Sequence, residues 1–203
     1  MTARTLLLAL ALPVLTATTV LTAPGVALAG DLKGVVELFT SQGCSSCPPA
    51  DAELARLAEQ DGVLALSYHV DYWNYLGWTD TLSSKASTDR QYGYAKTFRR
   101  GNVYTPQAVV NGQDHVNGAD GAAIRTMLDT FSSNGGGLTV EVSARMNADE
   151  LRISVGAGEG KADIVAVYFD DSSTVKIGRG ENSGRTITYR HSVRDIETVG
   201  MWN

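Results

Sequence analysis

The sequence predicts an α/β core followed by a β-rich antiparallel C-terminal subdomain. Before residue 134, short apolar runs alternate with stretches of helical periodicity, which is typical of βαβ units. After the triple glycine at 135–137, apolar and polar residues alternate along one short run after another, as in half-buried antiparallel strands. We therefore expect three parts: a signal peptide at 1–29, an α/β domain at 30–134 and a β-rich subdomain at 138–203.

The first 29 residues read as an export signal. Arg4 supplies a positive start, Leu6–Leu21 is almost wholly apolar, and Ala27–Ala29 has the small-x-small pattern of a cleavage site. The alternative is an uncleaved membrane anchor, but Pro13 and Pro24 weaken a spanning helix. We therefore expect a secreted or periplasmic protein that is cleaved after Ala29 and is not held in a membrane.

The charge distribution excludes several classes of partner. The chain has 17 Lys and Arg against 22 Asp and Glu, a formal net charge of −5, and its charges are dispersed without a basic stripe. Nucleic acid and anionic membrane surfaces are therefore not expected partners. The sequence shows no motif for a bound cofactor or metal, and it leaves the oligomeric state open.

Two near-continuous apolar runs predict buried parallel strands. Gly34–Thr40 and Val63–Val70 are short and rich in aliphatic residues, and Pro48–Gln60 lies between them as a helix with Leu54 and Leu57 on one face. Prolines are tolerated in the first helical turn, because the N–H groups there lack helical partners. The three segments predict one βαβ unit.

The rest of the α/β domain continues the alternation. A helix is expected around Ser84–Phe98, a strand at Gln107–Val110, a hairpin turn at Asn111-Gly112, a returning strand at His115-Val116 and an amphipathic helix at Gly121–Phe131. The summed order is β-α-β-α-β-β-α.

The C-terminal part is a succession of predicted strands. A glycine-rich run at Gly180–Thr186 resembles a phosphate-binding loop, but its spacing is wrong and Arg185 stands where lysine is required, so we interpret it as a turn between two strands. The expected strands are Leu138–Met146, Leu151–Val155, Ala162–Asp170, Val175–Arg179 and Arg185–Val193.

Cys44 and Cys47 are the only cysteines of the chain, and they form a C-x-x-C pair between a strand and a helix. An exported protein that used disulfides only for stability would be expected to spread its cysteines over the fold, so the pair favours thiol–disulfide chemistry. A helix N-terminus stabilises a thiolate. We therefore expect Cys44 to be the nucleophile and Cys47, one turn along, to be the resolving thiol and its disulfide partner. The alternative is a static disulfide, although so small a loop adds little stability.

Longer motifs give the chain a family resemblance. The element order with C-x-x-C at the first helix resembles the thioredoxin fold, and the sequence is similar to the secreted bacterial family called domain of unknown function 1223. The resemblance implies a thioredoxin-like domain at 30–134 with a β-rich part after it, and little about activity. The residues that carry it are Glu37–Asp51, His69–Trp78, Val103–Gln107, Arg179–Asn182 and Val193–Asp195.

The same resemblance assigns a role to Thr105-Pro106. In thioredoxin-like folds the X-Pro bond at this point is cis and faces the C-x-x-C pair, so that Pro106 borders the catalytic sulfurs and Thr105 offers backbone to an extended substrate. The alternative is an ordinary trans proline that starts an edge strand.

Two polar residues and a group of aromatics are further candidates for the site. Asp71 follows the second strand, where parallel sheets place their sites, and is a candidate proton acceptor for Cys47. His69 lies on the same side of that strand, although hydrogen bonds at a strand end explain both residues more simply. Trp73 and its neighbours Tyr72, Tyr75 and Trp78 form an apolar lip for a peptide or cover a core edge.

The leading hypothesis is a secreted thiol–disulfide oxidoreductase that acts on proteins or small disulfides. A second is copper(I) binding and delivery in the cell envelope, because two thiolates suit that ion. A third is a non-catalytic binding module built on the same fold. The sequence does not decide whether an oxidoreductase would oxidise, reduce or isomerise its substrate, because that depends on the redox potential of the pair.

Overall fold

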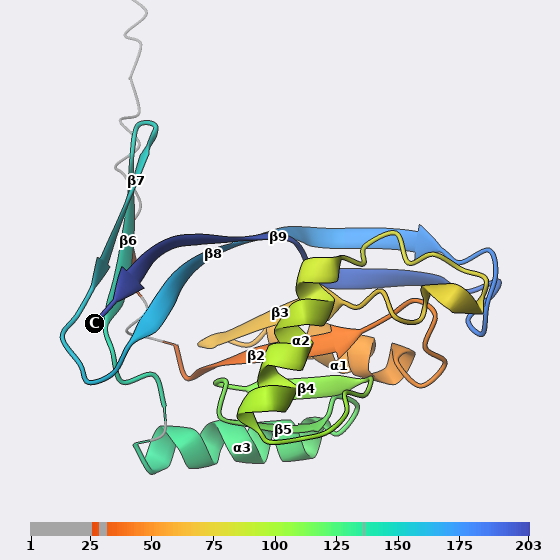
Figure 1. Ribbon diagram of the computed structural model, residues 1–203, viewed down its shortest axis with the longest axis horizontal. Coiled ribbons are helices and arrows are strands. Elements are labelled where there is room, and N and C mark those ends of the chain that lie inside the picture. The colour runs from red at the N-terminus through yellow and green to blue at the C-terminus, as the bar shows by residue number, and fades with distance from the viewer. Residues whose placement is uncertain (1–25, 29–31, 136) are drawn as a thin grey trace, which may run out of the picture.

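The computed structural model describes residues 26–28, 32–135 and 137–203. Its main feature is a six-stranded mixed sheet in the order β5-β4-β2-β3-β9-β8 (Figure 1). A smaller sheet has the order β1-β6-β7. The predicted α/β fold with a thioredoxin-like arrangement and an antiparallel C-terminal part is confirmed.

The predicted βαβ unit forms the centre of the large sheet. Strand β2 (Gly34–Thr40) runs parallel to β3 (Val63–His69) over its whole length, from the pair Gly34 and Val63 to the pair Thr40 and His69. Helix α1 (Pro48–Ala58) connects them and ends two residues earlier than expected. The carboxyl ends of β2 and β3 therefore lie side by side, which is where parallel sheets carry their sites.

The remaining elements follow the predicted order. At the turn between β4 and β5, Asn111 and Gly112 have φ angles of 52° and 65°, as the Asn-Gly signal indicates. The elements are the short η2 (Asn74–Leu76), α2 (Lys85–Thr97), β4 (Gln107–Val110), β5 (Asp114–Asn117) and α3 (Gly121–Ser133).

The C-terminal part consists of two hairpins. Strands β6 (Val142–Asn147) and β7 (Glu150–Val155) pair with each other, and β1 (Val26–Leu28) pairs with β6. Strands β8 (Ala162–Lys176) and β9 (Thr186–Trp202) form a long hairpin that runs above the other strands of the large sheet in Figure 1.

The β8–β9 hairpin adds to the large sheet, because β9 is paired with β3 in parallel at Ser192 and Ser67. Residues far beyond the expected boundary near 134 thus share a sheet with the α/β elements, and the division into two domains stays a prediction. Two of the expected strands are fused in β8, and β9 continues past Val193, where the last strand was expected to end.

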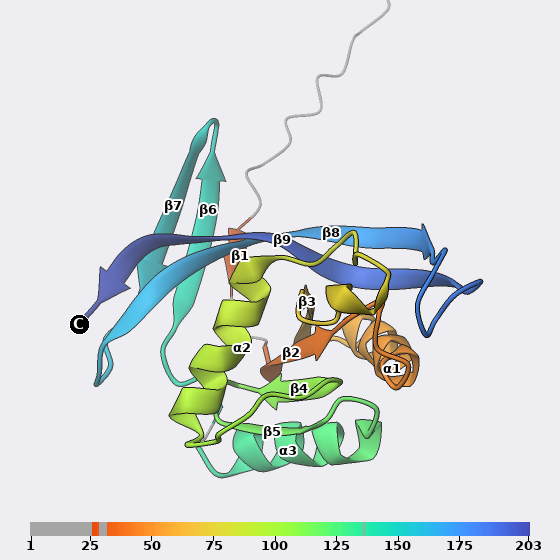
Figure 2. The ribbon, with the colours of Figure 1, turned by 45° about the vertical axis from the view of Figure 1, so that its right-hand side comes forward.

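The two faces of the sheet carry separate apolar clusters. Alternation along β2 sends Leu38 to the face covered by α1 and α3 and Phe39 to the face crossed by α2 (Figure 2). On the α2 face, Arg90 forms an ion pair with buried Glu37, whose carboxylate also accepts a hydrogen bond from the Tyr94 hydroxyl. These contacts fix α2 above the central strands.

The predicted signal peptide lies largely outside the described residues, which include only the β1 segment of it. Cleavage after Ala29 would remove β1 from the edge of β6. Within the described ranges no helix is long and apolar enough to cross a membrane.

Candidate functional site

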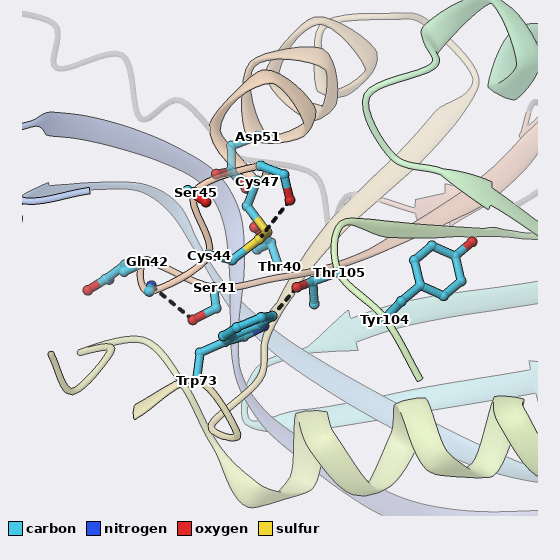
Figure 3. The surroundings of a disulfide bond; sticks show 12 residues. Thr40, Ser41, Gln42, Cys44, Ser45, Cys47, Asp51, Trp73, Tyr104 and Thr105 are labelled. Atoms are coloured by element: carbon cyan, nitrogen blue, oxygen red, sulfur yellow. Dashed lines mark hydrogen bonds between the residues drawn. A yellow bond between two sulfur atoms is a disulfide. The ribbon is translucent and has the colours of Figure 1, made fainter. Parts of the chain in front are cut away.

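The two cysteines form a disulfide in the loop between β2 and α1, as expected. Their Cα atoms are 5.4 Å apart. Both residues are buried, with Cys44 2% exposed and Cys47 fully covered. Figure 3 shows the bond between the start of α1 and the segment that carries Thr105. The Cys44 sulfur is therefore covered by neighbouring groups.

The start of α1 offers Cys44 fewer free backbone N–H groups than we expected from the sequence. Helix α1 begins at Pro48 with Cys47 as its N-cap, so Cys44 lies one turn before the helix, and the Cys47 N–H donates to the Cys44 carbonyl at 3.2 Å. Pro48 and Pro49 have no N–H, and that of Ala50 donates to the Cys47 carbonyl at 2.8 Å. The helix dipole remains, but fewer free donors face a Cys44 thiolate than the sequence led us to expect.

The Ser46 hydroxyl is the polar group in closest described contact with the Cys44 sulfur. Its Oγ lies 3.4 Å from Cys44 Sγ. A hydroxyl at this distance donates to a thiolate once the disulfide is reduced, so it replaces part of the missing backbone donation. Because of Ser46, the surroundings of the Cys44 sulfur are not purely apolar.

Thr105 and Trp73 lie together beside the disulfide (Figure 3). The Thr105-Pro106 bond is cis, as the resemblance implies. The Trp73 indole Nε1 donates to the Thr105 hydroxyl at 2.8 Å, and a Cβ placed on Gly43 would be 3.1 Å from that of Trp73. Trp73 therefore covers the loop next to Cys44, while the roles predicted for Thr105, Pro106 and Trp73 in exchange stay predictions.

The other three aromatics of the expected lip have different surroundings in the structure. Tyr75 is 78% exposed. The Tyr72 hydroxyl donates to Gln91 of α2 at 3.2 Å, and burial raises the pKa of Tyr72 to about 12. The Trp78 indole donates to Gln42 Oε1 at 2.8 Å. Trp73 and Tyr72 therefore both interact with the Thr105 side chain.

Asp71 is bound to α2. Its Oδ1 accepts from the Thr88 hydroxyl at 2.6 Å, and its backbone N–H donates to the Thr88 hydroxyl oxygen at 3.0 Å. The contacts of the described residues do not join Asp71 to either cysteine. The structure thus gives no support to Asp71 as a proton acceptor for Cys47.

A buried carboxyl that the sequence reading missed lies next to Cys47. Asp51 is one helical turn further along α1, on the same side as Cys47, and Figure 3 shows it beside the disulfide. The Thr40 hydroxyl donates to Asp51 Oδ1 at 2.6 Å. Burial raises the pKa of Asp51 to about 7. The signal was available, because Asp51 falls four residues after Cys47 on the apolar face that carries Leu54.

His69 lies deeper in the same region. It is fully buried at the end of β3, and its Nδ1 is 2.8 Å from Asp80 Oδ2. Asp80 follows η2 and also accepts from the backbone N–H groups of Gln42 and Leu82, each at 2.8 Å. Burial alone would raise the pKa of Asp80, but His69 and these hydrogen bonds hold it below the usual value. Asp80 is therefore an ionised carboxylate inside the fold.

A loop from the C-terminal hairpin closes the other side of the C-x-x-C loop. We call residues 177–185, between β8 and β9, the strap. The buried amide of Asn182 donates to the carbonyls of Gln42 at 3.0 Å and Cys44 at 2.8 Å, and Glu181 Oε2 accepts from the Ser45 N–H at 3.2 Å. Sequence reading predicted only a turn here, because nothing local signals a contact with residues so distant in the chain.

Among the described residues no group of three or more His, Cys, Asp and Glu side chains is arranged to hold a metal ion. The site consists instead of one disulfide, the Thr105 segment, the strap and a buried acid.

The fold and the site define a thioredoxin-like protein with a single C-x-x-C disulfide. The model of the protein family of unknown function DUF1223 matches residues 35–203, and the chain belongs to that family. It is also similar to a protein from Agrobacterium tumefaciens whose crystal structure is known. The two sequences are 54% identical, the match covers 85% of this chain and 75% of the other, and the TM-score is 0.78. No curated protein matches.

Proposed function

We propose that this protein is a secreted thiol–disulfide oxidoreductase that exchanges disulfides with a protein or a small thiol through Cys44 and Cys47. The observation that carries the proposal is the pairing of its only two cysteines in the loop between β2 and α1. A structural bridge over so short a loop adds little to stability, so the redox role explains the pair better. An oxidising compartment outside the cytoplasm, secreted or periplasmic, fits such a pair.

The exchange takes place in two displacements. In the reductive direction the Cys44 thiolate attacks one sulfur of the substrate disulfide, and the other substrate sulfur leaves as a thiolate and takes a proton. Cys47 then loses its proton and attacks the Cys44 sulfur, which forms the Cys44–Cys47 bond and releases the second substrate thiol. The substrate gains two electrons and two protons from the dithiol, and the opposite direction reverses each step.

The burial of Cys44 limits the side from which a substrate can approach its sulfur. The sulfur is covered by the loop on which Trp73 rests, and the strap holds the far side through Asn182. The Trp73 side is held by one side-chain hydrogen bond to Thr105, so it is the side that opens at lower cost. We infer that substrates approach between Trp73 and Thr105.

The two cysteines have different expected roles, which allows a matched test. The Cys47→Ser variant, mixed with glutathione disulfide, should hold a stable mixed disulfide on Cys44 that is seen by mass spectrometry. The Cys44→Ser variant should form much less adduct, because Cys47 is the more deeply buried thiol. Equal adducts on both variants, or none on either, would reject the proposed roles.

A further inference from the structure

Three buried residues from separate elements, one of them next to Cys47, are close enough to interact electrostatically, and each carries a polar atom that is unpaired within the part of the chain that the structure describes. These atoms are Asp51 Oδ2 on α1, His69 Nε2 on β3 and the Tyr189 hydroxyl on β9. The rings of His69 and Tyr189 meet edge to face, with centroids 4.7 Å apart. Unpaired buried polar atoms are costly to a fold, so such a cluster beside a redox pair calls for a functional explanation.

Asp80 fixes the orientation of His69. Because this carboxylate only accepts hydrogen bonds, the His69 Nδ1 atom at 2.8 Å must carry the hydrogen. The remaining nitrogen, Nε2, is then left without this partner. It is one of the three unpaired atoms of the cluster that includes Asp51 Oδ2.

We propose that Asp51 accepts the proton of Cys47 during disulfide exchange, and that His69, oriented by Asp80, is a positioning residue that keeps Asp51 ionised. The inference rests on the proposed function and adds a buried proton route to it. Two observations carry it: Asp51 lies one turn from Cys47 on the same helix face, and its second carboxylate oxygen is unpaired among the described residues.

The groups around Asp51 determine the pH at which its carboxyl can take up a proton. Burial and the negative charge of Asp80 make its ionisation harder, whereas His69 and the Thr40 hydroxyl make it easier. Tyr189 on β9 is neutral, because burial and the two nearby carboxylates raise its pKa above the usual value. The resulting balance lets Asp51 exchange its proton near neutral pH.

The proton and electron balance of the resolving step is simple. The Cys47 S–H proton moves to the Asp51 carboxylate, and the Cys47 sulfur attacks Cys44 in the mixed disulfide. The Cys44–Cys47 bond forms, the bond from Cys44 to the substrate breaks, and the electron pair leaves with the substrate thiolate. In reverse, protonated Asp51 returns the proton to the departing Cys47 sulfur, so the substrate disulfide or thiol is the only co-reactant.

The test is the pH profile of the resolving step. Reduced full-length protein is mixed with glutathione disulfide, and decay of the mixed disulfide is followed by mass spectrometry after acid quench. We expect the wild-type rate to rise with pH through about 7. Asp51→Asn should lose this rise and slow the step roughly 100-fold. His69→Gln should keep the rise but move it to higher pH. The control Asp89→Asn, at an exposed ion pair on α2, should match the wild type.

A second readout does not depend on activity. Titration of the Asp51 carboxyl carbon by NMR in the oxidised protein should give a midpoint near 7, and a higher one in His69→Gln. If wild-type protein forms no mixed disulfide, the proposed function fails. If it exchanges normally but Asp51→Asn has the wild-type profile, or if the Asp51 midpoint does not move in His69→Gln, the proton route is wrong while the oxidoreductase stands.

Discussion

The side-chain amide of Asn182 donates a hydrogen bond to the main-chain carbonyl of Cys44 at 2.8 Å, across 138 positions of sequence. The same amide donates to the Gln42 carbonyl, and Arg185 donates to the Asn182 oxygen at 3.1 Å. The loop of the C-terminal hairpin thus completes the wall of the redox site.

Removing the Asn182 amide should loosen the C-x-x-C loop. In Asn182→Ala two buried carbonyls lose their donor, so we expect the oxidised protein to lose about 1–3 kcal/mol of unfolding free energy in urea. The control is Asn102→Ala at an exposed position, which should change stability by less than about 0.5 kcal/mol. Equal stability of both variants would show that the strap does not hold the loop.

Glu181 places a negative charge next to the N–H of Ser45, the residue that follows Cys44. In Glu181→Gln this charge is gone, so the reduced Cys44 thiolate is stabilised and the pKa of Cys44 falls, by less than about one unit. The measurement is thiolate absorbance against pH, with Glu159→Gln in an exposed loop as the control. A Cys44 pKa that rises or stays constant would remove Glu181 from the electrostatics of the site.

Trp73 should cover Cys44, and its hydrogen bond to Thr105 should slow the access of thiols to the Cys44 sulfur. Trp73→Phe keeps an aromatic ring but loses the indole donor, so we expect faster reaction of glutathione with Cys44 and a stability loss of about 0.5–1.5 kcal/mol. Tyr75→Phe, at a largely exposed ring, is the matched control. Slower reaction at unchanged stability would mean that Trp73 binds the substrate instead of covering the sulfur.

Asp51 should make the stability of the oxidised protein depend on pH. Its pKa is raised in the fold from 3.8 to about 7, so the folded state binds the proton more tightly than the unfolded state does. Stability from this group is present below about pH 4, falls as pH rises, and levels off above about 7. Asp51→Asn should therefore gain stability over wild type as pH rises across this window, on the order of 2–4 kcal/mol.

Chemical denaturation of the oxidised wild type and Asp51→Asn at several pH values checks this dependence. A constant difference between the two proteins across the window would show that the carboxyl titrates as an ordinary exposed one.

The sequence predicted the parts of this fold that local patterns determine. Nearly continuous apolar runs marked β2 and β3, because strands covered on both faces carry mostly apolar residues, although Glu37 and Ser67 are buried polar exceptions. The hairpin glycine and the C-x-x-C pair were equally local signals. Strand β8 was read as two strands, because its polar middle around Ser172 lacks apolar alternation, although that stretch still pairs with β9.

The missed site residues depend on tertiary contacts. Asn182 contributes through carbonyls of a loop that only the folded chain brings near, and no pattern around it indicates this. Asp71 and His69 occupy similar places at the end of β3, yet one turns to α2 and the other into the core. Packing decides that Asp71 turns away from Cys47, whereas the four-residue spacing of Asp51 from Cys47 was visible in the sequence and was overlooked.

The central claim is that the Cys44–Cys47 bond is exchanged reversibly, and its redox potential tests this most directly. Purified protein is equilibrated with glutathione buffers of graded potential, and its thiols are trapped and counted by mass. The account predicts a single two-electron transition within roughly −120 to −270 mV, the range of exchange proteins. A bond that stays closed down to potentials below about −300 mV, as structural disulfides do, would contradict it.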